Sequence, residues 1–115
     1  MKPPEQPRKP KPLSHIRHRE EVAARLVMTL EALNLEVADV SRFLGISTSK
    51  FGNWTAPRNY PDVFLMTRFC ERYGVTMEWI YRGAAYGLPA ELADNLALAW
   101  AEKRAEMETR AHRPA

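Results

Sequence analysis

The chain is poor in the features that define several protein classes. Its 115 residues contain one cysteine, Cys70, so no disulfide can form within the chain. Cys70 falls in a helical apolar pattern and is expected to be a small buried hydrophobe. No apolar run approaches the roughly 18 residues that a membrane span requires. The basic N-terminus lacks a following apolar segment, so we expect no signal peptide and a cytoplasmic location.

The arrangements that carry enzyme chemistry are also lacking. We find no paired carboxylates, no Cys/His or Ser/His set on one expected face, and no glycine-rich phosphate loop. His15 and His18 are spaced like a weak metal pair, but no cysteine or acidic cluster completes it. The sequence therefore predicts a protein that is not an enzyme, with no cofactor, no metal and no evident small-molecule ligand.

No strand pattern exceeds three residues and no internal repeat is present, so the sequence predicts an all-α fold. The length allows one domain with a modest core. Apolar spacing, capping residues and glycines predict helices over residues 18–33, 36–44, 48–55, 63–73, 77–82 and 90–110. The fourth of these is expected to face the core with Val63, Met66, Phe69, Cys70 and Tyr73.

Charge is distributed unevenly along the chain. Residues 1–19 contain six lysines or arginines and one acid, whereas residues 20–115 contain eleven bases and thirteen acids. Residues 40–61 contain no acid at all, and their cations are Arg42, Lys50 and Arg58. A local positive window of this kind favours contact with the phosphates of a nucleic acid.

Residues 1–17 form a basic, proline-rich arm that is too poor in apolar groups to fold alone. Two interpretations are open. The arm either lies along DNA, with Arg17 and Arg19 as the cations nearest the folded domain, or serves as a disordered solubilising tail.

The most informative stretch covers residues 37–54. Gly45 permits the positive φ that ends a helix, and Ser47 can cap the next one. In that second helix Phe51 and Trp54 can face inward, which leaves Thr48, Ser49, Lys50 and Asn53 pointing outward. Two short helices joined in this way, with a polar outer face on the second, predict a helix-turn-helix that reads DNA.

The run Val-Ser-Arg-Phe-Leu-Gly-Ile-Ser-Thr-Ser-Lys-Phe-Gly-Asn-Trp at residues 40–54 resembles the core of the Cro/repressor-like (XRE-type) helix-turn-helix family. The resemblance extends over about residues 20–83. It implies a five-helix lambda-repressor-like DNA-binding domain at 18–83, to which residues 84–115 add a C-terminal helix. It also implies a sequence-specific regulator of transcription that binds double-stranded DNA, of bacterial or phage type.

The expected contacts follow from side-chain chemistry. Thr48 and Ser49 occupy the first turn of the reading helix, and the amide of Asn53 can pair with adenine. Lys50 suits a phosphate, and Arg42 and Arg58 are expected to bracket the groove. Gly52, within the helix, indicates either close approach of its backbone to DNA or to the neighbouring helix, or a tolerated imperfection.

Three further interpretations concern function and assembly. We expect a repressor, because no separate sensor domain is evident and occlusion of a promoter needs only binding. We also expect a homodimer, because two-fold pairing doubles the length of DNA that is read. Trp100 on the last helix either forms that dimer contact, which we favour, or packs onto the domain. An antitoxin-like or adaptor protein-interaction module is the alternative function, favoured by Val37, which stands where the family usually carries glutamine.

Overall fold

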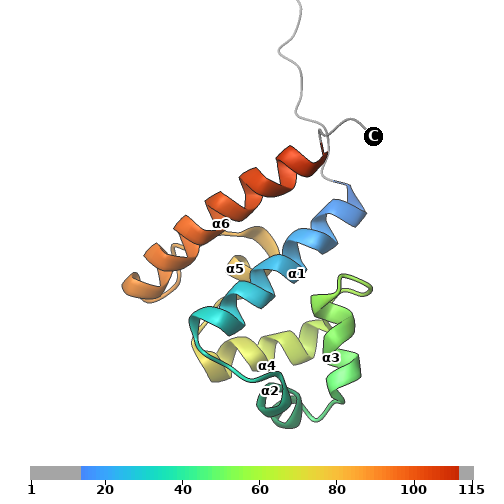
Figure 1. The fold of residues 1–115 in the computed structure, drawn as a ribbon. Coiled ribbons are helices and arrows are strands. Elements are labelled where there is room, and N and C mark those ends of the chain that lie inside the picture. The colour runs from blue at the N-terminus through green and yellow to red at the C-terminus, as the bar shows by residue number, and fades with distance from the viewer. Residues whose placement is uncertain (1–13, 112–115) are drawn as a thin grey trace, which may run out of the picture.

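Six helices make up the part of the chain that the computed structural model describes, residues 14–111, and no strand occurs there (Figure 1). They are α1 (His15–Ala32), α2 (Val37–Leu44), α3 (Thr48–Thr55), α4 (Val63–Tyr73), α5 (Met77–Arg82) and α6 (Ala90–Ala111). The all-α prediction is confirmed. Of the arm predicted for residues 1–17, residues 1–13 lie outside the described part of the chain. Within the described residues, no helix combines the length and the apolar character needed to cross a bilayer.

Local capping chemistry sets most of the helix ends. The hydroxyl of Ser47 accepts a hydrogen bond from the backbone N–H of Lys50 at 3.0 Å, and Asp62 and Thr76 cap α4 and α5 in the same way. Gly45 ends α2 with a φ of 72°, a left-handed conformation that glycine adopts without steric cost. These ends confirm the predicted caps and stops.

The start of α1 differs from the prediction. This helix begins at His15, three residues before the expected start, because Ser14 caps it by accepting a hydrogen bond from the Arg17 N–H at 3.0 Å. Arg17 and Arg19 are therefore part of a helix, and the arm ends before residue 17.

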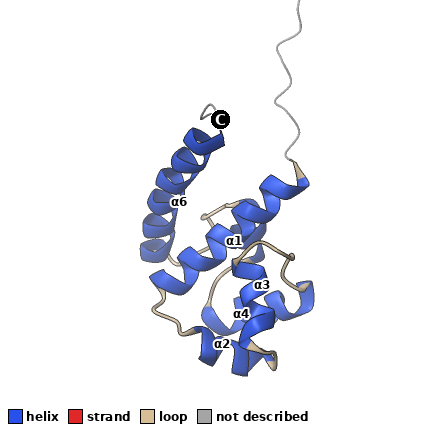
Figure 2. Cartoon of the chain, turned by 45° about the vertical axis from the view of Figure 1, so that its right-hand side comes forward, coloured by secondary structure: helices blue, strands red, loops and turns tan. Residues whose placement is uncertain are grey.

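Helix α1 lies between α6 and the group formed by α2, α3 and α4 (Figures 1 and 2). It packs against α3, α5 and α6, while α2 packs on α3 and α4. Figures 1 and 2 both show α6 alongside α1, separated by α1 from α2, α3 and α4. The shared core contains Leu26, Phe51, Trp54, Met66, Phe69, Cys70, Trp79, Ile80, Leu96 and Trp100. The burial of Phe51, Trp54 and Cys70 confirms their predicted roles.

Helix α6 belongs to this core. Leu96 and Trp100 are buried, and the guanidinium of Arg25 on α1 lies 4.7 Å from the centre of the Trp100 ring. Arg25 is itself only 2% exposed, and it donates a hydrogen bond to the Ile80 carbonyl at 2.9 Å. The favoured interpretation of Trp100 as a dimer contact is therefore wrong, because its surface is covered by its own chain.

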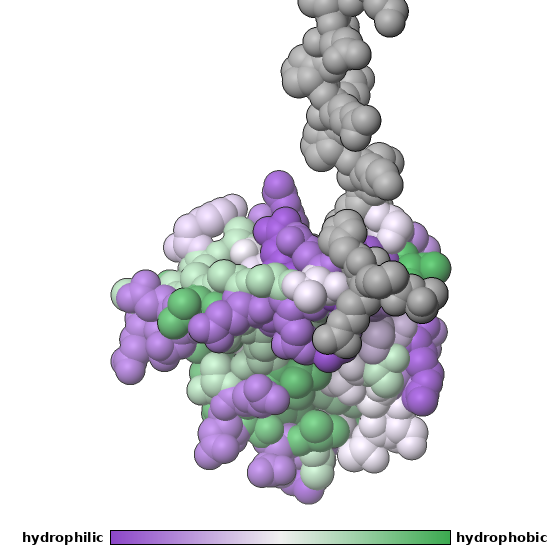
Figure 3. Space-filling view, turned by 45° about the horizontal axis from the view of Figure 1, so that its top comes forward, coloured by the Kyte–Doolittle hydropathy of each residue, from purple (hydrophilic) through white to green (hydrophobic). Residues whose placement is uncertain are grey.

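A second correction concerns α4. Val63 was expected to face the core, but it is 67% exposed, and its neighbour Phe64 is 70% exposed. In the same turn Leu65 is partly buried against the core, so the turn faces the core with Leu65 and leaves Val63 and Phe64 in contact with solvent. Hydrophobic surface reaches the exterior elsewhere as well, between hydrophilic side chains (Figure 3).

Candidate nucleic-acid interface

Helix α3 has one buried and one exposed face. Phe51 and Trp54 are buried, with their ring centres 5.5 Å apart. Thr48, Ser49 and Lys50 are exposed, and Asn53 is partly exposed. The aromatic pair fixes the rotation of the helix about its axis, so its polar side chains face outward.

The first turn of α3 carries positive partial charge. A helix N-terminus leaves backbone N–H groups without intrahelical acceptors, and their dipoles favour an approaching anion. The Ser47 hydroxyl accepts from the Lys50 N–H and is therefore used within the chain. The neighbouring Thr48 and Ser49 hydroxyls stand at the exposed end of the helix.

Asn53 connects α3 to the loop that follows it. Its backbone carbonyl accepts hydrogen bonds from the N–H groups of Arg58 (2.9 Å) and Asn59 (3.1 Å). Its side-chain oxygen accepts a further hydrogen bond from Arg58 Nη1 at 3.3 Å. The exposed Arg58 is therefore held beside Asn53 by both main chain and side chain.

The predicted cations differ in how their charge is compensated. Among the described residues, Lys50 and Arg58 have no carboxylate within ion-pair distance. Arg42, near the end of α2, pairs with Asp39 at 3.2 Å, but both side chains are well exposed. Exposed pairs of this kind are weak, so an incoming phosphate can compete for Arg42.

The structure does not bring Arg17 and Arg19 to the polar face of α3. Figure 1 shows the first turn of α1 well apart from the first turn of α3. Arg17 pairs with Glu21 at 3.3 Å, and the partly buried Arg19 has an Nε atom without a hydrogen-bond partner in the part of the chain described. The candidate interface therefore consists of Thr48, Ser49, Lys50, Asn53, Arg58 and, at its edge, Arg42.

Two structural features were missed by the sequence interpretation. Arg68 and Arg72 on α4 both lie over the ring of Phe43 on α2, at 5.0 and 5.7 Å. Neither arginine has an ion-pair partner within residues 14–110, so they add positive charge to the α2–α4 surface. Their spacing of four residues was the available signal, but nothing in the sequence pointed to Phe43 as their shared contact.

The second missed feature is the hydrogen bonding of His18. Its Nε2–H donates to the Tyr81 carbonyl, and its Nδ1 is 2.8 Å from the Tyr60 hydroxyl. A carbonyl can only accept, which places a proton on Nε2, while the Tyr60 hydroxyl also lies 3.3 Å from the His15 carbonyl. His18 thus attaches the 56–62 loop, which carries Arg58, to α1 and α5.

No family model, curated protein or solved structure matches this chain.

Proposed function

We propose that the protein is a sequence-specific transcriptional regulator that binds double-stranded DNA by placing α3 in the major groove. In this proposal α2 and α3 form a helix-turn-helix of the Cro/repressor-like type within a five-helix lambda-repressor-like domain, and α6 is an addition to it. The single observation that carries the proposal is the outward polar face of α3, beside Lys50 and Arg58, which pair with no carboxylate of the described residues.

The chemistry of this face suits the groove. A duplex major groove about 12 Å wide admits one α-helix, whose N-terminal residues lie nearest the bases. Thr48 and Ser49 can donate or accept hydrogen bonds there, and the threonine methyl can contact the methyl group of thymine. Asn53, one turn further along, presents the amide that pairs with adenine.

The cations suit the phosphate backbone. Lys50 and Arg58 are exposed and uncompensated, so they can approach phosphates without first breaking an internal ion pair. Arg42 is the weaker candidate because Asp39 shares its charge. Phosphate contacts of this kind supply most of the affinity and none of the direct base specificity.

We further propose that the protein acts as a homodimer and represses by occluding promoters. A single reading helix contacts few base pairs, and two-fold pairing doubles the site. Because Trp100 is covered, the dimer contact must involve other residues. Leu98, on the outer side of α6 and 66% exposed, is an available apolar position.

Selection of bound fragments from random duplex DNA tests this function. We expect an enriched sequence with two-fold symmetry, bound by the wild-type chain in a fluorescence anisotropy titration. Lys50→Ala should weaken binding to selected and random duplexes alike, and should reduce the slope of log K against log salt concentration by about 0.9, the value for one lost phosphate contact.

Arg82→Ala is the matched control, because it removes one exposed positive charge from α5, which packs against α1 and α4. It should leave the slope nearly unchanged. Failure of the wild type to enrich any sequence, or equal effects of Lys50→Ala and Arg82→Ala, would contradict the proposed interface.

The exposed pair Val63 and Phe64 favours a second candidate, a protein-interaction module of the antitoxin or adaptor kind. Adjacent exposed apolar side chains are common at protein contacts. A chain that shifts no duplex at low salt, but loses a co-purifying protein when Phe64 is changed to Ser, would favour this candidate instead.

A further inference from the structure

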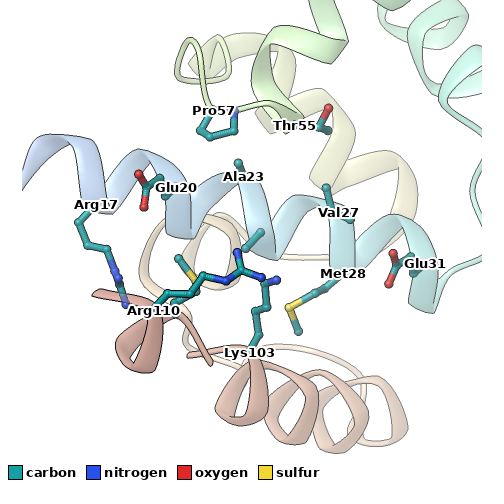
Figure 4. Close-up of a pocket in the computed structure, with 12 residues that line it drawn as sticks. Arg17, Glu20, Ala23, Val27, Met28, Glu31, Thr55, Pro57, Lys103 and Arg110 are labelled. Atoms are coloured by element: carbon teal, nitrogen blue, oxygen red, sulfur yellow. The ribbon is translucent and has the colours of Figure 1, made fainter. Parts of the chain in front are cut away.

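A groove of about 630 Å³ lies between α1 and the C-terminal half of α6, bordered on a third side by Thr55 and Pro57 (Figure 4). Its volume falls within the range of about 300–1,000 Å³ that is typical of small-molecule sites. It lies away from the outward polar residues of α3, none of which lines it.

One part of the groove is apolar. Ala24, Val27 and Met28 contribute from α1, and Met107 contributes from α6. All four are partly buried, so each retains apolar surface that an occupant could cover. Methionine side chains are flexible and adapt to the shape of an aliphatic ligand.

The α6 side of the groove carries excess positive charge. Arg110 Nη2 lies 2.8 Å and Lys103 Nζ lies 3.7 Å from the same oxygen of Glu106. The single carboxylate of Glu106 therefore pairs with both Arg110 and Lys103. Figure 4 shows the nitrogens of Arg110 and Lys103 side by side in the space between the helices. Arg17, at one end, likewise shares Glu21 with Arg25.

The acids of the lining do not neutralise this pair. Glu20 and Glu31 both belong to α1, and the structure gives neither an ion pair with Lys103 or Arg110. Figure 4 shows Glu31 at the far end of α1 and the Glu20 carboxylate directed away from the two cations. The groove thus has an apolar wall and a cationic wall, and the two cations of that wall can pair with a further anion.

We propose that this groove binds an anionic amphiphile of the fatty-acid class. The carboxylate lies against Arg110 and Lys103, since guanidinium and carboxylate form strong charge-assisted hydrogen bonds. The aliphatic chain lies over Val27, Met28 and Met107. The basic arm of this chain, with Lys2, Arg8, Lys9 and Lys11, is the wrong occupant of the Lys103–Arg110 end, because those two cations would repel its charges.

The test uses three probes with the same tail and different heads, namely decanoate, decanol and decylammonium. Each is titrated into the full chain and followed by amide chemical shifts in NMR. We expect saturable binding of decanoate, weaker binding of decanol and the weakest binding of decylammonium. The largest shifts should fall on Ala24, Val27 and Met107, with little change at the buried Ile80 of α5.

The double variant Lys103→Gln/Arg110→Gln should weaken decanoate by about tenfold or more and leave decanol unchanged. Arg104→Gln is the matched control, because Arg104 lies on the same helix, is exposed and does not line the groove. The double variant and the control change only surface residues, and thermal unfolding checks that both variant proteins remain folded.

Four results would overturn the proposal: no binding, equal binding of all three probes, shifts centred on another surface, or dilution shifts at the groove that identify a second copy of this chain as its occupant. The readout is ligand binding itself, so its result does not depend on whether the chain binds DNA.

Discussion

Arg58 donates a hydrogen bond from its guanidinium to the side-chain oxygen of Asn53, with Nη1 and Oδ1 3.3 Å apart. This contact holds the one amide on the outer face of α3 in a defined orientation, with its oxygen toward the loop. A bidentate pair with adenine needs both the oxygen and the nitrogen of Asn53. When the Asn53 amide pairs with a base, its oxygen must therefore either accept from both Arg58 and the base or lose the hydrogen bond from Arg58.

Asn53→Ala is expected to reduce the preference for the selected duplex over a scrambled one. A good bidentate pair discriminates by about 1–3 kcal/mol, which corresponds to about five- to 150-fold in the affinity ratio. Arg58→Ala should weaken both duplexes. Because the two side chains are in contact, the effects of the two substitutions should not add in a double-mutant cycle. Unchanged discrimination by Asn53→Ala, measured by anisotropy at fixed salt, would contradict base reading by this residue.

Gly52→Ala is expected to stabilise the protein. Gly52 is helical, its φ is not positive, and a Cβ added there would meet nothing within 4 Å. Alanine in a helix interior is favoured over glycine by about 0.5–1 kcal/mol, which urea unfolding can measure. This open space excludes close packing against a neighbouring helix as the reason for the glycine.

The same variant separates the remaining explanations for Gly52. If the backbone of α3 approaches DNA closely there, Gly52→Ala should weaken duplex binding while it stabilises the fold. If the glycine is merely tolerated, affinity should stay the same. A loss of stability would contradict the open surroundings of this position.

The helices could be predicted from sequence because their ends depend on neighbouring residues. Ser47, Asp62 and Thr76 cap through contacts three residues away, and the α3 boundaries are those expected. Ser14 offered the same kind of signal for α1. The basic, proline-rich composition of residues 1–13 carries no helical periodicity, so the predicted arm runs past this cap to residue 17.

The parts that could not be predicted depend on contacts between residues far apart in the chain. His18 joins Tyr60 and Tyr81, which are 42 and 63 positions away. Trp100 is covered because α6 returns to Arg25, and no periodicity within α6 indicates whether its apolar stripe meets this chain or another one. Periodicity identifies an apolar face but does not identify what packs against it.

Arg25→Ala is expected to destabilise the protein strongly. Burial lowers the pKa of the Arg25 guanidinium, and Glu21 opposes that shift. Removal of the Arg25 side chain leaves the Ile80 carbonyl without this donor and Trp100 without its cation. Leaving a buried acceptor without its donor costs about 1–3 kcal/mol, and more when the donor is charged.

Arg104→Ala is the control for Arg25→Ala, since Arg104 is an exposed arginine of α6, and its effect on the free energy of unfolding should stay within about 0.5 kcal/mol. Urea unfolding followed by tryptophan fluorescence measures both variants. Equal stability of the two would show that Arg25 does not attach α6 to the rest of the domain.

Gly83→Ala should cost more stability than Gly74→Ala. Both positions have positive φ, 74° and 71°, so each alanine incurs the left-handed penalty of about 1–2 kcal/mol. At Gly83 the added Cβ would also lie 3.1 Å from Trp100 Nε1 and 3.3 Å from Arg25 Nη1, whereas Gly74 has open space. Similar unfolding free energies for the two variants would indicate that α6 shifts to relieve the contact.

Alkaline pH is expected to destabilise the fold through the buried Cys70 thiol and the partly buried Tyr81 hydroxyl. Burial raises the pKa of the Cys70 thiol from 9.0 to about 11 and that of the Tyr81 hydroxyl from 10.0 to about 12. Between these values the folded state binds more protons than the unfolded state, so the free energy of unfolding falls as pH rises. The stabilisation is fully present below about pH 9 and is lost as pH rises through about 11 to 12.

Urea midpoints measured across this window should decline less steeply in Cys70→Ala and in Tyr81→Phe than in the wild type. Identical slopes in all three proteins would indicate that the alkaline loss arises from other groups.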